Sequence, residues 1–134
     1  MAAKALSGIL ERVRRALPGA SGEELACRHL ASRGFVILDR NYRCRSGEVD
    51  IVAREGEATV FVEVKERGSP SHGEGLEAVT FGKRRRIIRA ARLYAASRGL
   101  SETRLRFDVV SIDGTRGDAP RIRHDRDAFD AEGR

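Results

Sequence analysis

Three charged residues, Asp50, Glu63 and Lys65, stand in two stretches that are otherwise typical of apolar β-strands. Strand side chains alternate between faces, so Glu63 and Lys65 share a face, and a hairpin between the stretches brings Asp50 to the same spot. Neighbouring carboxylates repel each other, and burying them unpaired is costly. A divalent cation resolves this conflict, since Mg²⁺ binds one or two carboxylates together with phosphate oxygens. The pattern therefore favours hydrolysis of a phosphodiester, with Lys65 orienting the water or stabilising the transition state.

The same alternation also has a purely structural explanation. An edge strand with one solvated face often carries charged side chains that pair with each other. Glu63 and Lys65 would then form an exposed ion pair without a catalytic role. The residues alone leave both interpretations open.

The elements that must position these residues follow from apolar periodicity, capping residues and turns. Helices are expected at about residues 1–17, 21–33 and 80–99, and the second opens on a capping box of Ser21 and Glu24. Strands are expected at about residues 35–38, 48–53, 58–65 and 104–112, with a short strand and turn within 121–129. This order predicts an α/β protein with a mixed sheet and helices packed on it.

Length and composition limit the class of protein. The chain has 134 residues, of which 40% are hydrophobic and 34% charged, which favours one globular domain. We expect this domain at 19–130, after an amphipathic helix or extension at 1–18 and before a frayed tail at 131–134. No apolar run approaches the roughly 18 residues of a membrane span. Two cysteines exclude a disulfide scaffold, so we expect a cytoplasmic protein with reduced thiols and no membrane partner.

A strongly basic segment accompanies the charged strands. The net charge is +6, the pI is about 10.1, and the helix expected at 80–99 carries Lys83, Arg85, Arg89 and Arg92. The three arginines line one helix face, which fits the phosphate backbone of a nucleic acid. The alternative is a solvated face that keeps the protein soluble. Aromatic residues are only 5%, which argues against base stacking as the mode of binding.

Two ordered motifs resemble a known family: Gly47-Glu48-Val49-Asp50, then Phe61-Val62-Glu63-Val64-Lys65 with Arg67. They are similar to those of the YraN-like family of uncharacterised bacterial proteins. That family is similar in turn to archaeal Holliday junction resolvases and to the PD-(D/E)XK superfamily. The resemblance covers about residues 21–129 and includes Gly22-Glu23-Glu24-Leu25-Ala26, Asn41-Tyr42-Arg43, Ala78-Val79 with Lys83, and Arg106-Phe107-Asp108-Val109-Val110.

This resemblance implies a restriction-endonuclease-like fold and a role for each matching residue. Asp50, Glu63 and the backbone carbonyl of Val64 match the ligands of Mg²⁺ or Mn²⁺, and Lys65 matches the catalytic lysine. Glu23 matches an acidic residue that resolvase-like members carry on their first helix, although an acid in a first turn also favours the helix dipole. Val49 replaces the proline of the superfamily's name, as is usual in this branch.

Two weaker candidates complete the expected site. Glu48 lies in the family motif near Asp50 but is equally suited to a surface ion pair, and His72 lies in a loop from which it could approach a phosphate. The expected function is binding of nucleic acid by a metal-dependent endonuclease acting on structured DNA. The alternatives are a non-catalytic nucleic-acid-binding protein that retains the fold, and a protein that docks its basic helix on an acidic partner. Resolvases of the superfamily act as symmetric dimers, so the resemblance also implies a homodimer.

Overall fold

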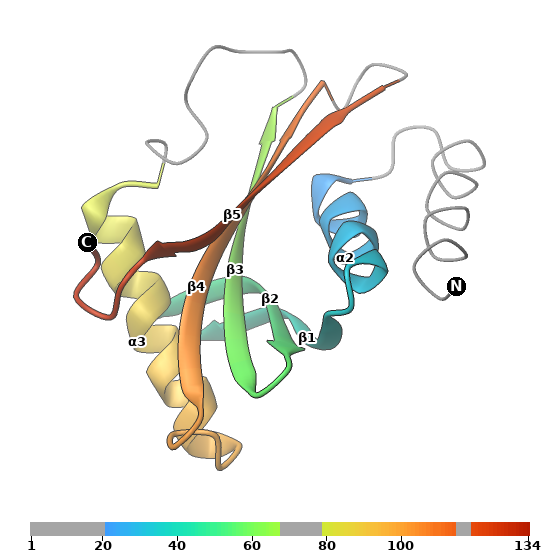
Figure 1. Ribbon diagram of the computed structural model, residues 1–134. Helices are drawn as coiled ribbons and strands as arrows, with labels where there is room; N and C mark the ends of the chain where they lie inside the picture. The colour runs from blue at the N-terminus through green and yellow to red at the C-terminus, as the bar shows by residue number, and fades with distance from the viewer. Residues whose placement is uncertain (1–20, 68–78, 115–118) are drawn as a thin grey trace.

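A computed structural model of the chain describes residues 21–67, 79–114 and 119–134. One five-stranded sheet runs in the order β1 (Val36–Cys44), β2 (Gly47–Glu55), β3 (Ala58–Arg67), β4 (Arg104–Asp113) and β5 (Arg121–Phe129). Only the β3–β4 pair is parallel; the other three neighbouring pairs are antiparallel. Helix α2 (Gly22–Ser32) covers one face of the sheet and α3 (Phe81–Ser97) the other (Figure 1). The α/β class is confirmed, and the architecture is compatible with a restriction-endonuclease-like fold.

The helices begin where their capping residues predict. The Ser21 hydroxyl accepts a hydrogen bond from the Glu24 N–H at 3.2 Å, and the Thr80 hydroxyl accepts one from the Lys83 N–H at 3.3 Å. The helix expected at 1–17 and the loop with His72 lie outside the described residues. No helix in the described parts of the chain is long and apolar enough to cross a membrane.

Strand β1 extends well beyond the expected 35–38. Its second half is polar and therefore has no apolar pattern, but β1 is an edge strand, so these side chains can face solvent while the backbone pairs with β2. Asn41 interrupts the strand with a φ of 53°, a left-handed conformation that asparagine tolerates better than most residues.

The alternation along β3 divides the interior into two cores. Val60, Val62 and Val64 pack on the α2 side, whereas Phe61 packs on the α3 side with Tyr94. The β3 strand lies in the centre of the sheet and both of its faces are covered. An exposed Glu63–Lys65 pair on a solvated face is therefore the wrong interpretation: Glu63 is only 4% exposed.

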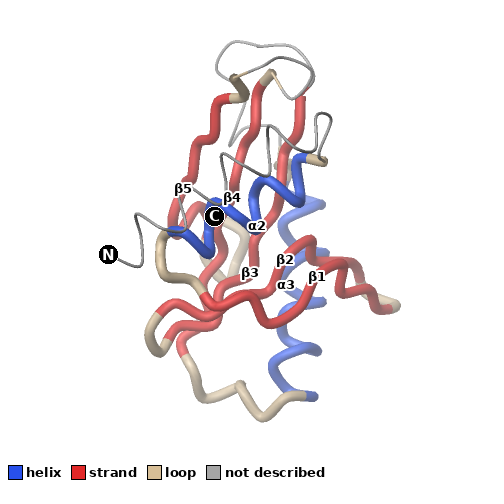
Figure 2. The backbone as a smooth tube through the Cα atoms, turned by 90° about the vertical axis from the view of Figure 1, so that its right-hand side faces the viewer, coloured by secondary structure: helices blue, strands red, loops and turns tan. Residues whose placement is uncertain are grey.

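The turn end of the β1–β2 hairpin leaves β3 and runs across α3 (Figure 2). Pairing of β2 with β3 ends at Ile51 and Val62, so Glu63 and Val64 of β3 have no backbone partner on β2. Two contacts hold the hairpin on the helix. Tyr42 meets Tyr94 edge-on at 5.1 Å between ring centroids, and Gly47 lies so close to Arg86 that a Cβ would stand 2.5 Å from its carbonyl oxygen.

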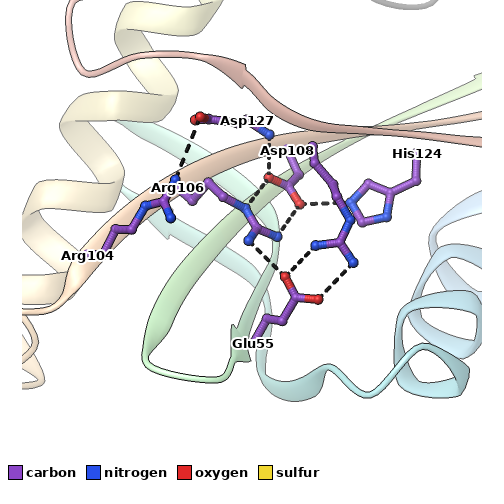
Figure 3. A network of polar contacts seen from close by, with 7 residues as sticks. Glu55, Arg104, Arg106, Asp108, His124 and Asp127 are labelled. Atoms are coloured by element: carbon purple, nitrogen blue, oxygen red, sulfur yellow. Dashed lines mark hydrogen bonds and ion pairs between the residues drawn. The ribbon is translucent and has the colours of Figure 1, made fainter.

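A buried polar network joins β5 to the body of the sheet (Figure 3). Asp108 is fully buried and accepts hydrogen bonds from Nε and Nη2 of Arg106 at 2.9 and 2.8 Å. Its carboxylate also bonds Nε2 of His124 at 2.7 Å and the Asp127 N–H at 3.0 Å. Asp127 lies in a bulge of β5 with a φ of 52°, so the Asp108 side chain replaces the ladder partner that the bulge removes. Glu55 extends the network by pairing with Arg106 at 2.8 Å.

The C-terminal residues 131–134, expected as a frayed tail, make hydrogen bonds to Asp130 and to α3. The Asp130 carboxylate accepts hydrogen bonds from the N–H groups of Glu132 and Arg134 at 2.9 and 3.0 Å. Arg84 of α3 donates to the carbonyl of Gly133 at 3.2 Å. A local aspartate turn thus closes the end of the chain on the helix.

Candidate active site

The candidate site begins where β2 and β3 part. Asp50 directly precedes Ile51, the first β2 residue that pairs with β3, and its Oδ2 accepts a hydrogen bond at 2.8 Å from the Val64 N–H. The carboxylate thereby takes the place of a carbonyl partner that the interrupted ladder no longer supplies. The N–H and C=O of one strand residue point the same way. The Val64 carbonyl therefore points toward the same opening as Asp50.

Glu63 lies at the centre of the site with two ammonium groups around it. Its Oε1 is 2.6 Å from Nζ of Lys83 on α3 and 3.9 Å from Nζ of Lys65 on β3. The Glu63 side chain is 5% exposed, whereas those of Lys65 and Lys83 are 20% and 42% exposed. The structure therefore brings Asp50, Glu63, Lys65 and Lys83 together, as the spacing of the strand residues predicts for the first three.

The protonation of the site reflects burial and mutual repulsion. Burial and the neighbouring Asp50 carboxylate raise the pKa of Glu63 to about 7, although the Lys83 ammonium opposes them. Burial and the adjacent Lys83 lower the pKa of Lys65. Burial is the largest single effect on Lys83 and acts against its charge, but the hydrogen bond and charge attraction to Glu63, together with Lys65 and Asp50, raise its pKa overall. Opposite shifts of neighbouring groups are typical of sites that handle protons.

Glu23 approaches the same site from the first turn of α2. Its Oε1 is buried and accepts no hydrogen bond, and it lies 3.7 Å from Nε of Arg40 on β1. Burial and the Asp50 carboxylate raise the pKa of Glu23, against the effects of Arg40 and Asn41. The helix dipole therefore does not fully explain Glu23, because its carboxylate also interacts electrostatically with Asp50 on β2.

The donor set fits a hard divalent cation. In the described ranges, no three His, Cys, Asp or Glu side chains are grouped to hold a metal by themselves. Mg²⁺ does not require such a group, since it commonly binds one or two carboxylates and keeps several waters. Asp50 and Glu63 with the Val64 carbonyl supply hard oxygen donors. A cation also relieves the repulsion that raises the pKa of Glu63.

The predicted arginine face is confirmed as a surface but lies apart from the carboxylates. Arg85, Arg89 and Arg92 are exposed, on the side of α3 opposite the buried Ile87 and Ala91. Arg92 donates to the Ala131 carbonyl at 3.4 Å, and Arg85 lies over the Phe81 ring at 5.8 Å.

Two exposed arginines that were not among the predicted binding residues lie between these two regions. Arg86 is exposed, and its backbone contacts Gly47 in the hairpin. Arg45, also exposed, lies in the turn just before Gly47. The sequence does contain a sign of this basic surface. Lys83, Arg86 and Arg89 are spaced by three residues, so they neighbour each other on successive turns of the helix. Glu48 pairs with Arg43 at 3.4 Å and is largely exposed, which agrees with the surface ion pair rather than with a ligand.

The buried Glu63 and the half-buried Asp50 stand with a lysine where a mixed sheet opens between two helices. This defines the class: an α/β protein compatible with the restriction-endonuclease-like fold. Residues 22–112 match the model of the uncharacterised protein family UPF0102. The chain belongs to this family, which confirms the resemblance to YraN-like proteins.

Similar proteins occur in several bacteria. A UPF0102 protein of Rhodococcus jostii is 50% identical over 111 residues, covering 83% of this chain and 94% of the relative. One from Anaeromyxobacter dehalogenans is 51% identical over 117 residues, covering 87% and 86%. One from Geobacter sulfurreducens is 46% identical over 112 residues, covering 84% and 88%. The names of these relatives state a family and no activity.

Proposed function

We propose that this protein is a metal-dependent nuclease that hydrolyses phosphodiester bonds in nucleic acid, with structured DNA as its substrate. One observation carries the proposal: Asp50, Glu63 and Lys65 meet at the opening between β2 and β3, in a largely buried position. A structural ion pair does not require two carboxylates side by side, because their repulsion costs stability. A site that receives a cation and a phosphate does require them.

Each residue of the site has a separate role in the proposed hydrolysis. Asp50, Glu63 and the Val64 carbonyl would hold Mg²⁺ or Mn²⁺, whose chemistry at such a site is activation of water and neutralisation of phosphate charge. Lys65 orients the attacking water and stabilises the charge that develops on the phosphate. Its lowered pKa, caused by burial and Lys83, suits exchange of a proton with that water. Glu23 adds a third carboxyl at the border of the site, where its raised pKa suits proton transfer.

The basic surface of α3 supplies the contacts to the backbone. Lys83 begins this surface at the carboxylates, and Arg86 and Arg89 continue it along the helix. The exposed Arg45 lies in the hairpin turn two residues before Gly47, which contacts the Arg86 backbone. Arg85 and Arg92 extend it to the outer face. Contacts of this kind recognise phosphates and the shape of the nucleic acid rather than its sequence. We also propose a homodimer, since cutting both strands of a duplex takes two sites. The proposed location is the cytoplasm.

The test is cleavage of four-way junction, flap, duplex and single-stranded DNA, and of RNA, in Mg²⁺, Mn²⁺ or EDTA. The purified protein is compared with Glu63→Gln, which keeps the side-chain volume in this buried place. We expect metal-dependent cleavage that the substitution lowers by at least about a hundredfold.

Glu57→Gln is the matched control. Glu57 is an exposed residue in the β2–β3 turn, so the same chemical change there should leave cleavage intact. Cleavage that survives Glu63→Gln would refute the site assignment and indicate a contaminating nuclease. Salt-dependent binding without cleavage of any substrate would instead establish the non-catalytic alternative.

A further inference from the structure

The ammonium of Lys83 lies beside Glu63, one of the residues that would hold the divalent cation. Nζ of Lys83 lies 2.6 Å from Oε1 of Glu63, closer than Nζ of Lys65 at 3.9 Å from the same oxygen. Two ammonium groups thus face the two carboxylates of Glu63 and Asp50. The charges of the site cancel without any metal.

The position of Lys83 in its helix does not explain its presence. Lys83 is the third residue of α3, and its N–H is bonded to the capping hydroxyl of Thr80. A cation in the first turn opposes the helix dipole, and the first turn of α3 contains no acid to offset it. The compensating partner is Glu63, on another element. Lys83 therefore serves the strand carboxylates and not the helix.

We propose that Lys83 is the resident counter-ion of Glu63, and that binding of a divalent cation displaces its ammonium from the carboxylate to a phosphate of the nucleic acid. This inference rests on the proposed function and adds a coupling between the two ligands. A divalent cation that binds alone is repelled by the two ammonium groups of Lys65 and Lys83. A phosphate that binds alone is repelled by the two carboxylates of Glu63 and Asp50. Each ligand therefore binds better when the other is present, and the coupling is reciprocal.

The side chain of Lys83 is suited to such a movement. It is 42% exposed, so its ammonium can leave Glu63 without opening the core. Four flexible carbons connect it to a backbone that the Thr80 cap holds in place. Lys65 is 20% exposed and lies on the central strand, so it is the less mobile of the two lysines.

The first experiment measures Mn²⁺ binding by isothermal titration calorimetry to the wild-type protein, Lys83→Met and Arg89→Met. We expect Lys83→Met to bind Mn²⁺ about tenfold more tightly, because it removes a competing cation beside the ligands. Arg89→Met removes the same charge from the exposed surface of the same helix and should change the affinity less than about twofold. Circular dichroism checks that each variant is folded.

The second measurement is binding of a labelled DNA duplex in EDTA and in Ca²⁺. Ca²⁺ serves as a divalent cation with which we expect binding but no cleavage. Lys83→Met should match the wild type in EDTA, where Glu63 holds the ammonium, and should bind several-fold more weakly in Ca²⁺. Equal weakening in both conditions would overturn the inference, because Lys83 would then contact phosphate without displacement. Unchanged or weaker Mn²⁺ binding by Lys83→Met would also overturn it. If the wild type and Lys83→Met both bind no Mn²⁺, the proposed metal site fails as well, which separates the two failures.

Discussion

Replacing Asp108 by Asn should strongly destabilise the fold while keeping the shape of the side chain. The Asp108 carboxylate accepts four hydrogen bonds, from two nitrogens of Arg106, from Nε2 of His124 and from the Asp127 N–H. Asn has one acceptor oxygen, and its NH₂ group would face donors. Two hydrogen bonds to a charged group at about 1.5–3 kcal/mol each predict a loss of about 3–6 kcal/mol. Arg106 keeps Glu55 as a partner, which places the expected loss near the lower value.

Urea unfolding followed by circular dichroism measures this loss. With a slope of about 1–3 kcal/mol per molar urea, the midpoint should fall by at least about 1 M. Asp127→Asn is the control, because the Asp127 side chain forms an ion pair with Arg104 at 3.7 Å in which both side chains are largely exposed. It should cost less than about 1 kcal/mol. Equal effects of the two substitutions would refute the assignment of β5 anchoring to the buried carboxylate.

Three further predictions concern pH, packing and charge. Burial alone would raise the pKa of Asp108, but hydrogen bonds from His124 and Arg106 lower it to about 2 in the folded protein. A carboxyl with a lowered pKa stabilises the fold above its unfolded value of about 3.9 and loses this effect as the pH falls through the folded value. The melting temperature of the wild type should therefore drop in this acid window more steeply than that of Asp108→Asn. Gly47→Ala should cost about 1–3 kcal/mol in urea unfolding, because its Cβ would meet the Arg86 carbonyl. Gly82→Ala meets no atom within 4 Å and should not destabilise. Arg89→Met should lower the slope of log affinity against log salt by about 1 if it contacts a phosphate, as fluorescence anisotropy would show.

The charged strand residues could be predicted because their positions depend on local rules. Alternation places Glu63 and Lys65 on one face of β3, and the turn after Glu55 pairs β2 with β3, which brings Asp50 near Glu63. The start of α2 followed from its capping box, and the start of α3 lies at the expected Thr80, whose hydroxyl caps the helix. Burial on both faces did not follow, because alternation is compatible with a solvated face and with a covered one.

Contacts between distant elements were beyond the sequence. Arg106 and Asp108 alternate with apolar residues, which indicates a solvated face, yet the structure buries them in a network with residues of β2 and β5. The contact between Lys83 and Glu63 depends on how α3 crosses the sheet. Periodicity along one element contains no information on such crossings. The polar half of β1 was missed for the same reason, since its pairing depends on β2.

The division of β3 between two cores has a consequence for how the protein can change. Residues 60, 62 and 64 contribute to packing against α2, whereas 61, 63 and 65 face α3 and include the charged side chains of the site. Substitutions at the first set can alter stability while the candidate site stays the same, and substitutions at the second set can alter the candidate site while the α2 core stays intact. A single-residue deletion in β3 exchanges the two sets, so we expect variation in this strand by substitution and not by length.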